Sequence, residues 1–488
     1  MSGINVDRIL EIGIALSKEK NTDRLLELIL NEALSITNCD AGTLYTKHGD
    51  TLKFQIMLTR SMNYSKGGNG EEIPLPPVQI TPKHVCSCAA IEHRLINLPD
   101  VYHAEEYNFS GPREYDTLIG YKTKSMLVLP IEDDFGYVLG VLQLINAMDD
   151  EGNVIPFSKE YEKIIIALSS QIAMYIRKRK YEIEITKLFD SFVYVMSAAV
   201  DARSPYNANH TKNMVRFGKN FVSYLNEKQG DWTFSELEER QFLMSIWLHD
   251  IGKLVIPLEI MDKRTRLGDC LRCVKHRFER IELLTELDFV KGKLTKEEYE
   301  QRLEELHYDL EFILHTDSIS FVDAKRASYI QKIQKKRYLE KNGNWYPYLT
   351  LEETKCLMIP KGTLTAEERS LMEQHVDITE HLLKRIHFTK QLEKVPVWAP
   401  AHHEFLDGSG YPNRKTADEI EREVRIMTIF DIFEALIATD RPYKKPLTIE
   451  KAFCVLNEMV EEGKLDGDIL RLFIESRAWE KNEEGDFI

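Results

Sequence analysis

Histidines and acidic residues gather in two short stretches in the second half of the chain. The first is His249-Asp250-Ile251-Gly252-Lys253, and the second is His402-His403-Glu404 followed by Asp407-Gly408-Ser409-Gly410-Tyr411-Pro412. Imidazole and carboxylate groups are ligands that first-row divalent metals accept in enzymes. A pair of such metals neutralises the charge of a phosphodiester and lowers the pKa of a bound water. The two stretches therefore predict a metal-dependent phosphoesterase.

Three further residues strengthen this prediction. His210 precedes the first stretch in a helical segment, and His375 follows the apolar pair Leu371-Met372. Asp431 lies within the apolar run 426–433, where a carboxylate is costly unless it is paired or bound to metal. Asp250 has two oxygens and is expected to bridge two metals. Lys253 follows on the same helix face and is expected to bind a phosphate oxygen.

The elements that position these residues are expected to be helices. The run 242–248 is apolar and leads directly into His249, which indicates a rigid core helix. A capping box, Thr365-Ala366-Glu367-Glu368, opens the helix that carries His375. After Ala202 no strand-like alternation persists, so this half of the chain is predicted to be an all-α helical domain.

The first half of the chain has a different organisation. We expect a helix over about 5–36, then strands at 41–45, 52–56, 125–131 and 138–146, which is an α+β pattern. A long helix over 159–202 joins the two halves. Its apolar residues keep a seven-residue rhythm that predicts a parallel dimer seam, namely Ile165, Leu168, Ile172 and Tyr175. The alternative is that these side chains pack only on their own sheet.

Bulk properties narrow the class of protein. The chain has 488 residues, which predicts two or three domains, and 43% hydrophobic and 29% charged residues, typical of a globular protein. The net charge, 64 − 79 = −15, argues against nucleic acid or an anionic membrane as partner. No apolar run reaches the roughly 18 residues of a membrane span, and no signal-peptide pattern opens the chain. We expect a cytoplasmic protein whose seven cysteines are reduced.

Residues 5–178 resemble a GAF domain of the cyclic-nucleotide-phosphodiesterase type. The resemblance is carried by Glu114-Tyr115-Asp116, by 120–131 and by Gly140-Val141-Leu142-Gln143-Leu144-Ile145-Asn146. It implies an antiparallel sheet with flanking helices, and a pocket that holds a cyclic nucleotide or another small effector. The alternative is a dimerisation unit without a ligand. Cys86 and Cys88 suggest a redox or haem role or, more simply, buried or exposed thiols.

Residues 186–488 resemble an HD-GYP domain of the HD phosphohydrolase superfamily. The motifs are 249–253, 402–412 and 425–443, in that order. Members hydrolyse cyclic di-GMP to pGpG and often to GMP, some prefer hybrid cyclic GMP-AMP, and their metals are iron and manganese. The resemblance implies metal ligands His210, His249, Asp250, His375, His402, His403 and Asp431, with catalytic roles for Asp250 and Lys253. It implies substrate contacts from Lys253, Gly408, Gly410, Tyr411, Pro412 and Arg441.

Departures from the HD-GYP pattern carry their own predictions. Some members have a third-metal glutamate where this chain has Tyr206, so we predict two metal ions. Residues 264–358 form an insertion with its own capping box, Thr295-Lys296-Glu297-Glu298. We expect a helical hairpin or lid over the metal site, or else a surface decoration that binds a partner. Its Cys270, Cys273 and His276 could hold a metal with Cys356, or be unpaired.

These observations predict a cyclic di-GMP phosphodiesterase regulated by its GAF domain. The signal would travel along the helix 159–202 of a homodimer. One alternative is a hydrolase of hybrid cyclic GMP-AMP or of another phosphoester. The other is a non-catalytic receptor for cyclic dinucleotides, or a module that docks diguanylate cyclases.

Overall fold

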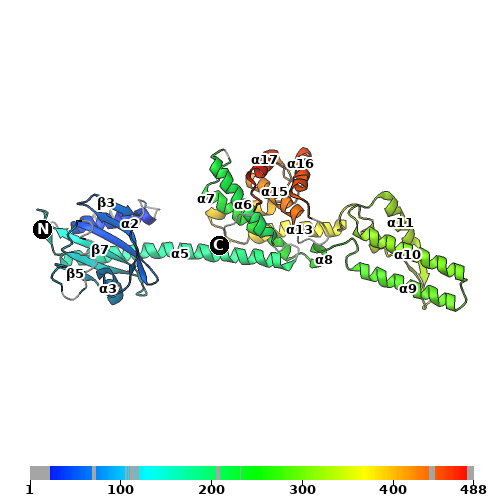
Figure 1. The fold of residues 1–488 in the computed structure, drawn as a ribbon, viewed down its shortest axis with the longest axis horizontal. Helices are drawn as coiled ribbons and strands as arrows, with labels where there is room; N and C mark the ends of the chain where they lie inside the picture. Colours follow the sequence, from blue (N-terminus) through cyan, green and yellow to red (C-terminus); the bar gives the residue numbers. More distant parts are fainter. Residues whose placement is uncertain are drawn as a thin grey trace. The chain divides into compact units, whose positions relative to one another are not determined.

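The computed structural model describes residues 22–68, 73–104, 107, 109, 116, 120–204, 209–230, 232–438 and 446–480. Contacts divide the chain into two compact units, Met1–Phe189 and Asp190–Ile488, and helix α5 (Lys159–Arg203) runs through the boundary (Figure 1). Within the described ranges, no helix is both long and apolar enough to cross a membrane.

The N-terminal unit is built on one antiparallel sheet. Its strands lie in the order β3-β2-β1-β7-β6-β5, while β4 pairs with β2 and β8 with β7. The four predicted strands are confirmed as β1, β2, β6 and β7; β1, β2 and β7 are longer than expected, and β6 has the expected length. The bounds are β1 (Cys39–His48), β2 (Thr51–Thr59), β3 (Tyr64–Gly67), β4 (Val78–Gln79), β5 (Ile96–Leu98), β6 (Met126–Glu132), β7 (Val138–Met148) and β8 (Val154–Ile155).

Alternation along the strands gives this sheet two apolar faces, each covered by helix. On one face, α2 (Thr22–Thr37) and the first part of α5 bury Ile29, Leu34 and Ile165 against Leu142 and Leu144. On the other, α3 (Val85–Glu92) packs its own set of apolar side chains against β6 and β7. The helix predicted from residue 5 is described only from Thr22 onward.

The C-terminal unit gathers helices around an aromatic core. Phe217, Phe242, Phe430 and Phe473 are fully buried and pack edge to face or tilted against one another. The helices are α6 (His210–Lys228), α7 (Glu236–Leu248), α8 (Leu258–Met261), α13 (Ala366–Leu383), α14 (Val395–Trp398), α15 (Arg422–Ile437), α16 (Ile449–Glu461) and α17 (Gly467–Ser476). Short 3-10 turns are η1 (Ile251–Leu254), η2 (Lys390–Leu392), η3 (Ala399–Ala401) and η4 (Ala417–Glu419).

The insertion has a core of its own. Helices α9 (Cys270–Val290), α10 (Lys296–Ser318), α11 (Ala324–Lys335) and α12 (Leu351–Leu357) bury Phe278, Ile313, Ile330 and Leu357 together. The predicted helical hairpin is thus present as α9 and α10. Figure 1 shows α9, α10 and α11 extending away from α6, α7 and α15, so the hairpin is no lid over those helices in this structure.

The structure adds two findings about the insertion. It is not purely helical, because β9 (Arg337–Leu339) and β10 (Trp345–Pro347) form a hairpin. The signal was Asn342-Gly343 between aromatic residues, a strong hairpin turn pattern. Of the two alternatives for its cysteines, the structure favours unpaired thiols, because the groups of ligand atoms close enough to hold a metal, among the residues described, include none of them. Cys270 and Cys273 are instead exposed on α9.

The seam predicted on α5 used the wrong face of the helix. Ile165, Leu168 and Ile172 are buried in the core under the sheet, with Tyr175 packed beside them. The seven-residue spacing of these side chains therefore reflects packing against the sheet of their own unit, not a dimer seam. A different set of apolar side chains on α5 is exposed, including Met174, Tyr181 and Leu188.

Candidate metal centre

Five separate segments bring the predicted ligands together. His210 opens α6, His249 and Asp250 follow α7, and His375 lies in α13. His402 and His403 follow η3, and Asp431 lies in α15. The Asp250 carboxylate occupies the middle of the cluster. Its Oδ2 lies 3.2 Å from His249 Nε2, and its Oδ1 lies 3.4 Å from His375 Nε2 and 3.8 Å from His402 Nε2.

Asp431 is the second carboxylate of the cluster. Its Oδ1 lies 3.3 Å from His210 Nε2, and its Oδ2 lies 3.6 Å from His403 Nδ1. Three sets of side chains have ligand atoms within 4.8 Å of one another, and together they contain all seven predicted residues. The sets are His375, His402 and His403; His210, His249 and Asp431; and His249, Asp250 and His402.

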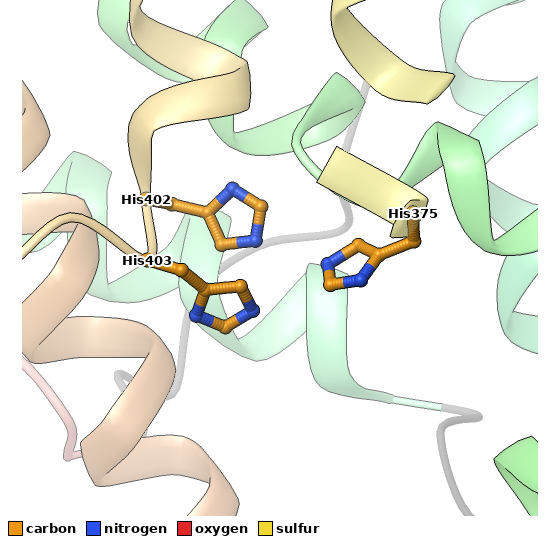
Figure 2. Close-up of side chains that lie close together, drawn as sticks. All are labelled: His375, His402 and His403. Atoms are coloured by element: carbon orange, nitrogen blue, oxygen red, sulfur yellow. The ribbon is translucent and has the colours of Figure 1, made fainter. Parts of the chain in front are cut away.

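Backbone carbonyls fix the orientation of three imidazoles. Nδ1 of His249, His375 and His402 each lies 2.7 Å from the carbonyl oxygen three residues earlier. If each Nδ1–H donates to that carbonyl, the Nε2 lone pair points into the cluster. Such a second hydrogen bond is a regular feature of metal-ligating histidines. The rings of His375, His402 and His403 converge in this way in Figure 2.

Buried atoms without partners test whether a metal fits here. Asp250 Oδ1, His375 Nε2 and His402 Nε2 are buried and make no hydrogen bond within the described residues. Leaving such groups unsatisfied is costly, and a coordinated cation would satisfy all three at once. The donor set of imidazoles and carboxylates fits a first-row divalent metal.

A residue that the sequence analysis passed over completes the centre. Glu434, one helical turn after Asp431, is buried, and its Oε2 lies 2.7 Å from His210 Nδ1. Asn213 Nδ2 donates to its other oxygen at 2.9 Å. Glu434 thereby orients His210 from behind. The signal was present, because a second carboxylate in the apolar run of α15 needs a partner as much as Asp431 does.

The electrostatics leave three imidazoles neutral. Burial lowers the pKa of His375 and His402, and lowers that of His403 to about 4. A neutral imidazole is the form that binds metal. Burial opposes ionisation of Asp250, yet His249 and Lys253 hold its pKa well below the usual range. His210 differs, because hydrogen bonds to Asp431 and Glu434 outweigh burial and raise its pKa to about 10, so a metal that binds His210 would displace its proton.

Lys253 lies at the open edge of the cluster. It belongs to the 3-10 turn η1, and its Nζ lies 2.5 Å from Asp250 Oδ2. Its side chain is 15% exposed, and those of His403 and Asp431 are 23% and 14% exposed. The side chains of His249, Asp250 and His402 are at most 4% exposed. A ligand would therefore reach the cluster at the edge formed by Lys253, His403 and Asp431.

The loop after His403 packs against the centre. The Tyr411 ring lies 4.7 Å from the His403 ring, and the Tyr411 N–H donates to the His403 carbonyl. Gly410 is required at its position, because a Cβ there would lie 2.4 Å from the backbone nitrogen of Phe405. Two other sequence predictions, on Arg441 and Tyr206, concern residues outside the described ranges.

Comparison with known families agrees with this organisation. A GAF domain model matches residues 21–176, and an HD domain model matches residues 352–469. The chain joins a GAF domain to an HD domain. The matched part of the HD domain contains His375, His402, His403 and Asp431, while the insertion separates it from His249 and Asp250.

Several of the curated relatives that match part of the chain are cyclic dinucleotide phosphodiesterases. The 3'3'-cGAMP-specific phosphodiesterase 3 of Vibrio cholerae is 40% identical over 97 residues, which cover 20% of each chain. The cyclic di-GMP phosphodiesterase of Thermotoga maritima is 36% identical over 109 residues, 22% of this chain and 28% of that protein. The response regulator RpfG of Xanthomonas campestris, also a cyclic di-GMP phosphodiesterase, is 34% identical with the same coverage. The chain thus spans between a fifth and a third of the length of these relatives.

Solved structures include GAF domains similar to part of the chain. One is the GAF domain of a phosphoenolpyruvate-protein phosphotransferase from Acinetobacter, at 17% identity and a TM-score of 0.29. The match covers 37% of this chain and 98% of that one.

Proposed function

We propose that the chain is a metal-dependent phosphodiesterase that hydrolyses cyclic dinucleotides. One observation carries the proposal: buried, unsatisfied ligand atoms of Asp250, His375 and His402 face one another beside Lys253 at an accessible edge. A purely structural cluster would have its polar atoms paired. The cyclic dinucleotide phosphodiesterases among the relatives suggest the substrate class.

Two divalent cations, iron or manganese, would be held by two overlapping sets of ligands. His210, His249, Asp250 and Asp431 form one set, and Asp250, His375, His402 and His403 form the other. Asp250 belongs to both because its two oxygens face different histidines. When bound, such cations offset the charge of the phosphodiester and supply an activated water for hydrolysis.

The remaining steps belong to side chains at the open edge. The ammonium group of Lys253 would shift part of its contact from Asp250 to a non-bridging phosphate oxygen. Its positive charge would then stabilise the negative charge that develops on that oxygen during hydrolysis. Gly408, Gly410, Tyr411 and Pro412 would border the substrate, with Tyr411 also holding His403 in place. Arg441 is proposed as a further substrate contact.

Regulation would use helix α5 of a homodimer. Arg203, at the end of α5, donates a hydrogen bond to the carbonyl oxygen of Lys253. A rotation or translation of α5 would therefore act on the residue next to the substrate. Diguanylate cyclases are further proposed partners.

The test is hydrolysis of two substrates side by side. Protein reconstituted anaerobically with ferrous iron or manganese is given cyclic di-GMP or hybrid cyclic GMP-AMP, and products are separated by chromatography. We expect turnover of at least one substrate, with pGpG or the mixed linear dinucleotide as the first product. The substrate that is hydrolysed faster is the preferred one. The Asp250→Asn variant should lose turnover, while Asp468→Asn on the surface of α17 should keep it.

The outcomes separate the alternatives. Tight binding of a cyclic dinucleotide without turnover, in protein shown to contain metal, would favour a receptor or docking module. If the protein hydrolyses another phosphoester but neither cyclic dinucleotide, the substrate belongs to a different class of phosphoester. Neither binding nor turnover by metal-loaded protein would overturn the proposal.

A further inference from the structure

Helix α6 begins with the proposed metal ligand His210, but its own sequence does not cap it. Within the described residues, Asn209 before the helix makes no capping hydrogen bond with its side chain, and the first turn contains no acidic residue. Helices α7, α10, α12 and α13, by contrast, each begin with a complete capping box. The N–H groups of a first helical turn lack partners within the helix and favour a nearby negative charge. The start of α6 therefore depends on groups that other elements supply.

Asp201, near the end of α5, supplies one such group. Its Oδ1 accepts a hydrogen bond at 3.1 Å from the hydroxyl of Thr211, the residue that follows His210. Asp201 is 4% exposed and Thr211 is 1% exposed, so the contact is buried. Burial raises the pKa of Asp201 to about 6, so its side chain is a carboxylate at pH 7.5. Because hydrogen bonds to a carboxylate are strong, this contact fixes the first turn of α6, from which the His210 side chain extends.

Asp201 acts through Thr211 and is not itself one of the ligands. In the part of the chain that the structure describes, it belongs to none of the three groups of ligand atoms that lie within 4.8 Å of one another. Two neighbouring contacts hold this end of α5 in place. Ser204 Oγ donates to Asp262 Oδ1 at 2.6 Å, and Arg203 donates to the carbonyl oxygen of Lys253. The Asp201 carboxylate thus meets α6 from an anchored position.

The two proposed ligand sets differ in how they are supported. His375 and His402 each have Nδ1 2.7 Å from a carbonyl oxygen three residues earlier in their own segment, and neither segment belongs to α6. His210 is held instead by Glu434 behind its ring and by the position of α6. A change at Asp201 should therefore affect the ion bound by His210 and spare the ion bound by His375 and His402.

We propose that Asp201 is a positioning residue that orients His210 through Thr211, so that the end of α5 sets the affinity of one of the two metal ions. The inference rests on the proposed function, because it takes the cluster of seven ligands as a site for two ions. It goes beyond that function by assigning a role to a residue outside the proposed ligands and substrate contacts. It also predicts that the two ions respond differently to the same substitution.

Manganese binding by the full chain at pH 7.5 tests the proposal. Equilibrium dialysis over a range of free manganese gives the number of bound ions and the affinity of each. We expect the wild type to bind two ions. In Asp201→Ala one ion should bind about tenfold or more weakly, as when a contact that orients a metal ligand is removed, while the other ion keeps its affinity. Thr211→Val removes the same hydrogen bond from its other partner and should have the same effect.

Two further variants serve as matched controls. Thr211→Ser keeps the hydroxyl and should bind both ions nearly as the wild type does. Asp190→Ala removes another carboxylate of α5, whose ion pair with Arg240 is partly exposed, and should change neither affinity. Circular dichroism and thermal unfolding check that each variant folds.

The outcomes distinguish this inference from the proposed function. Unchanged binding of two ions by both Asp201→Ala and Thr211→Val would overturn the inference alone. Equal weakening of both ions, which a general loss of structure would also cause, would overturn it too, as would a Thr211→Ser variant as weak as Thr211→Val. Fewer than two ions in the wild type would overturn the proposed centre of two metals, and the inference with it.

Discussion

At the scale of single residues, a substitution of Glu434 should weaken metal binding although Glu434 is not one of the seven proposed ligands. It contacts no proposed substrate or metal, yet it accepts the hydrogen bond from His210 Nδ1. Removing a carboxylate behind a metal-ligating histidine costs about 10- to 100-fold in metal affinity or activity. We expect Glu434→Ala to show a loss of this size, measured as bound manganese at fixed free manganese.

Two controls make the Glu434 prediction specific. Glu434→Asp keeps the charge and should retain part of the affinity. Glu475→Ala removes a carboxylate from an exposed ion pair with Lys228 and should leave metal binding unchanged. Wild-type manganese content in Glu434→Ala would show that His210 needs no such support.

At the scale of elements, Thr379 ties η1 to α13. Its hydroxyl accepts from the Gly252 N–H at 2.9 Å and donates to the His249 carbonyl at 3.1 Å. The two segments touch so closely that a Cβ on Gly252 would lie 1.9 Å from the His375 carbonyl oxygen. The Thr379 hydroxyl thus holds together His249, which precedes the insertion in the sequence, and the helix of His375, which follows it.

The Thr379→Val variant should reveal this link. Valine has a similar shape but leaves two buried backbone groups unpaired, which costs about 1–3 kcal/mol of unfolding free energy. We expect lower thermal stability and weaker metal binding together, measured by calorimetry and metal titration. Thr379→Ser keeps the hydroxyl and should behave nearly as wild type. Equal effects of both variants would show that the methyl group, not the hydroxyl, matters.

The insertion should lose stability in acid through one ion pair. Arg277 donates to both carboxylate oxygens of Glu353 at 2.6 and 2.9 Å. Burial opposes ionisation, but Arg277 and the Thr350 N–H lower the pKa of Glu353 below its ordinary value. A depressed pKa contributes stability above the unfolded-state pKa of about 4.3, and this stability is lost as the pH falls through the folded-state value.

Glu353→Gln measures that contribution. Hydrogen bonds between charged groups contribute about 1.5–3 kcal/mol, so amides of α12 should exchange faster in the variant at pH 7.5. Below pH 4 the difference between variant and wild type should shrink, because protonation removes the same charge in the wild type. A difference that stays constant from pH 7.5 to pH 3 would contradict the assignment.

At the scale of the whole molecule, the exposed apolar face of α5 would form the interface of the proposed dimer. Tyr181, Ile185, Leu188, Phe192 and Val195 follow one another at alternating spacings of four and three residues, and each is at least 48% exposed. This is the spacing of a coiled-coil seam. Pairing with a second copy would remove these side chains from water.

Charge on that seam should separate the protomers. We expect Leu188→Glu to give monomers where the wild type gives dimers, measured by sedimentation equilibrium. Leu351→Glu, at an apolar residue of the insertion that is 68% exposed, should leave the dimer intact. A wild-type monomer at all concentrations, or a dimer unaffected by Leu188→Glu, would overturn the proposed seam.

The sequence by itself predicted the strands of the GAF domain and the seven side chains that gather in the HD domain. It could do so because strand alternation is local, and because histidines and carboxylates in apolar helices stand out one segment at a time. Their role as metal ligands stays a prediction until metal is measured. The turn Asn342-Gly343 was equally local, so the β9–β10 hairpin was predictable although it was missed.

Only the tertiary structure decided the rest. A helical repeat shows that α5 has an apolar face, but the sheet beside it determines that Ile165 and Ile172 are buried and that Leu188 is left exposed. Glu434 meets His210 across 224 residues of sequence, and Thr379 meets Gly252 across 127. Such contacts depend on how whole helices pack. The residue types therefore set the chemistry, while packing set which partner holds each residue in place.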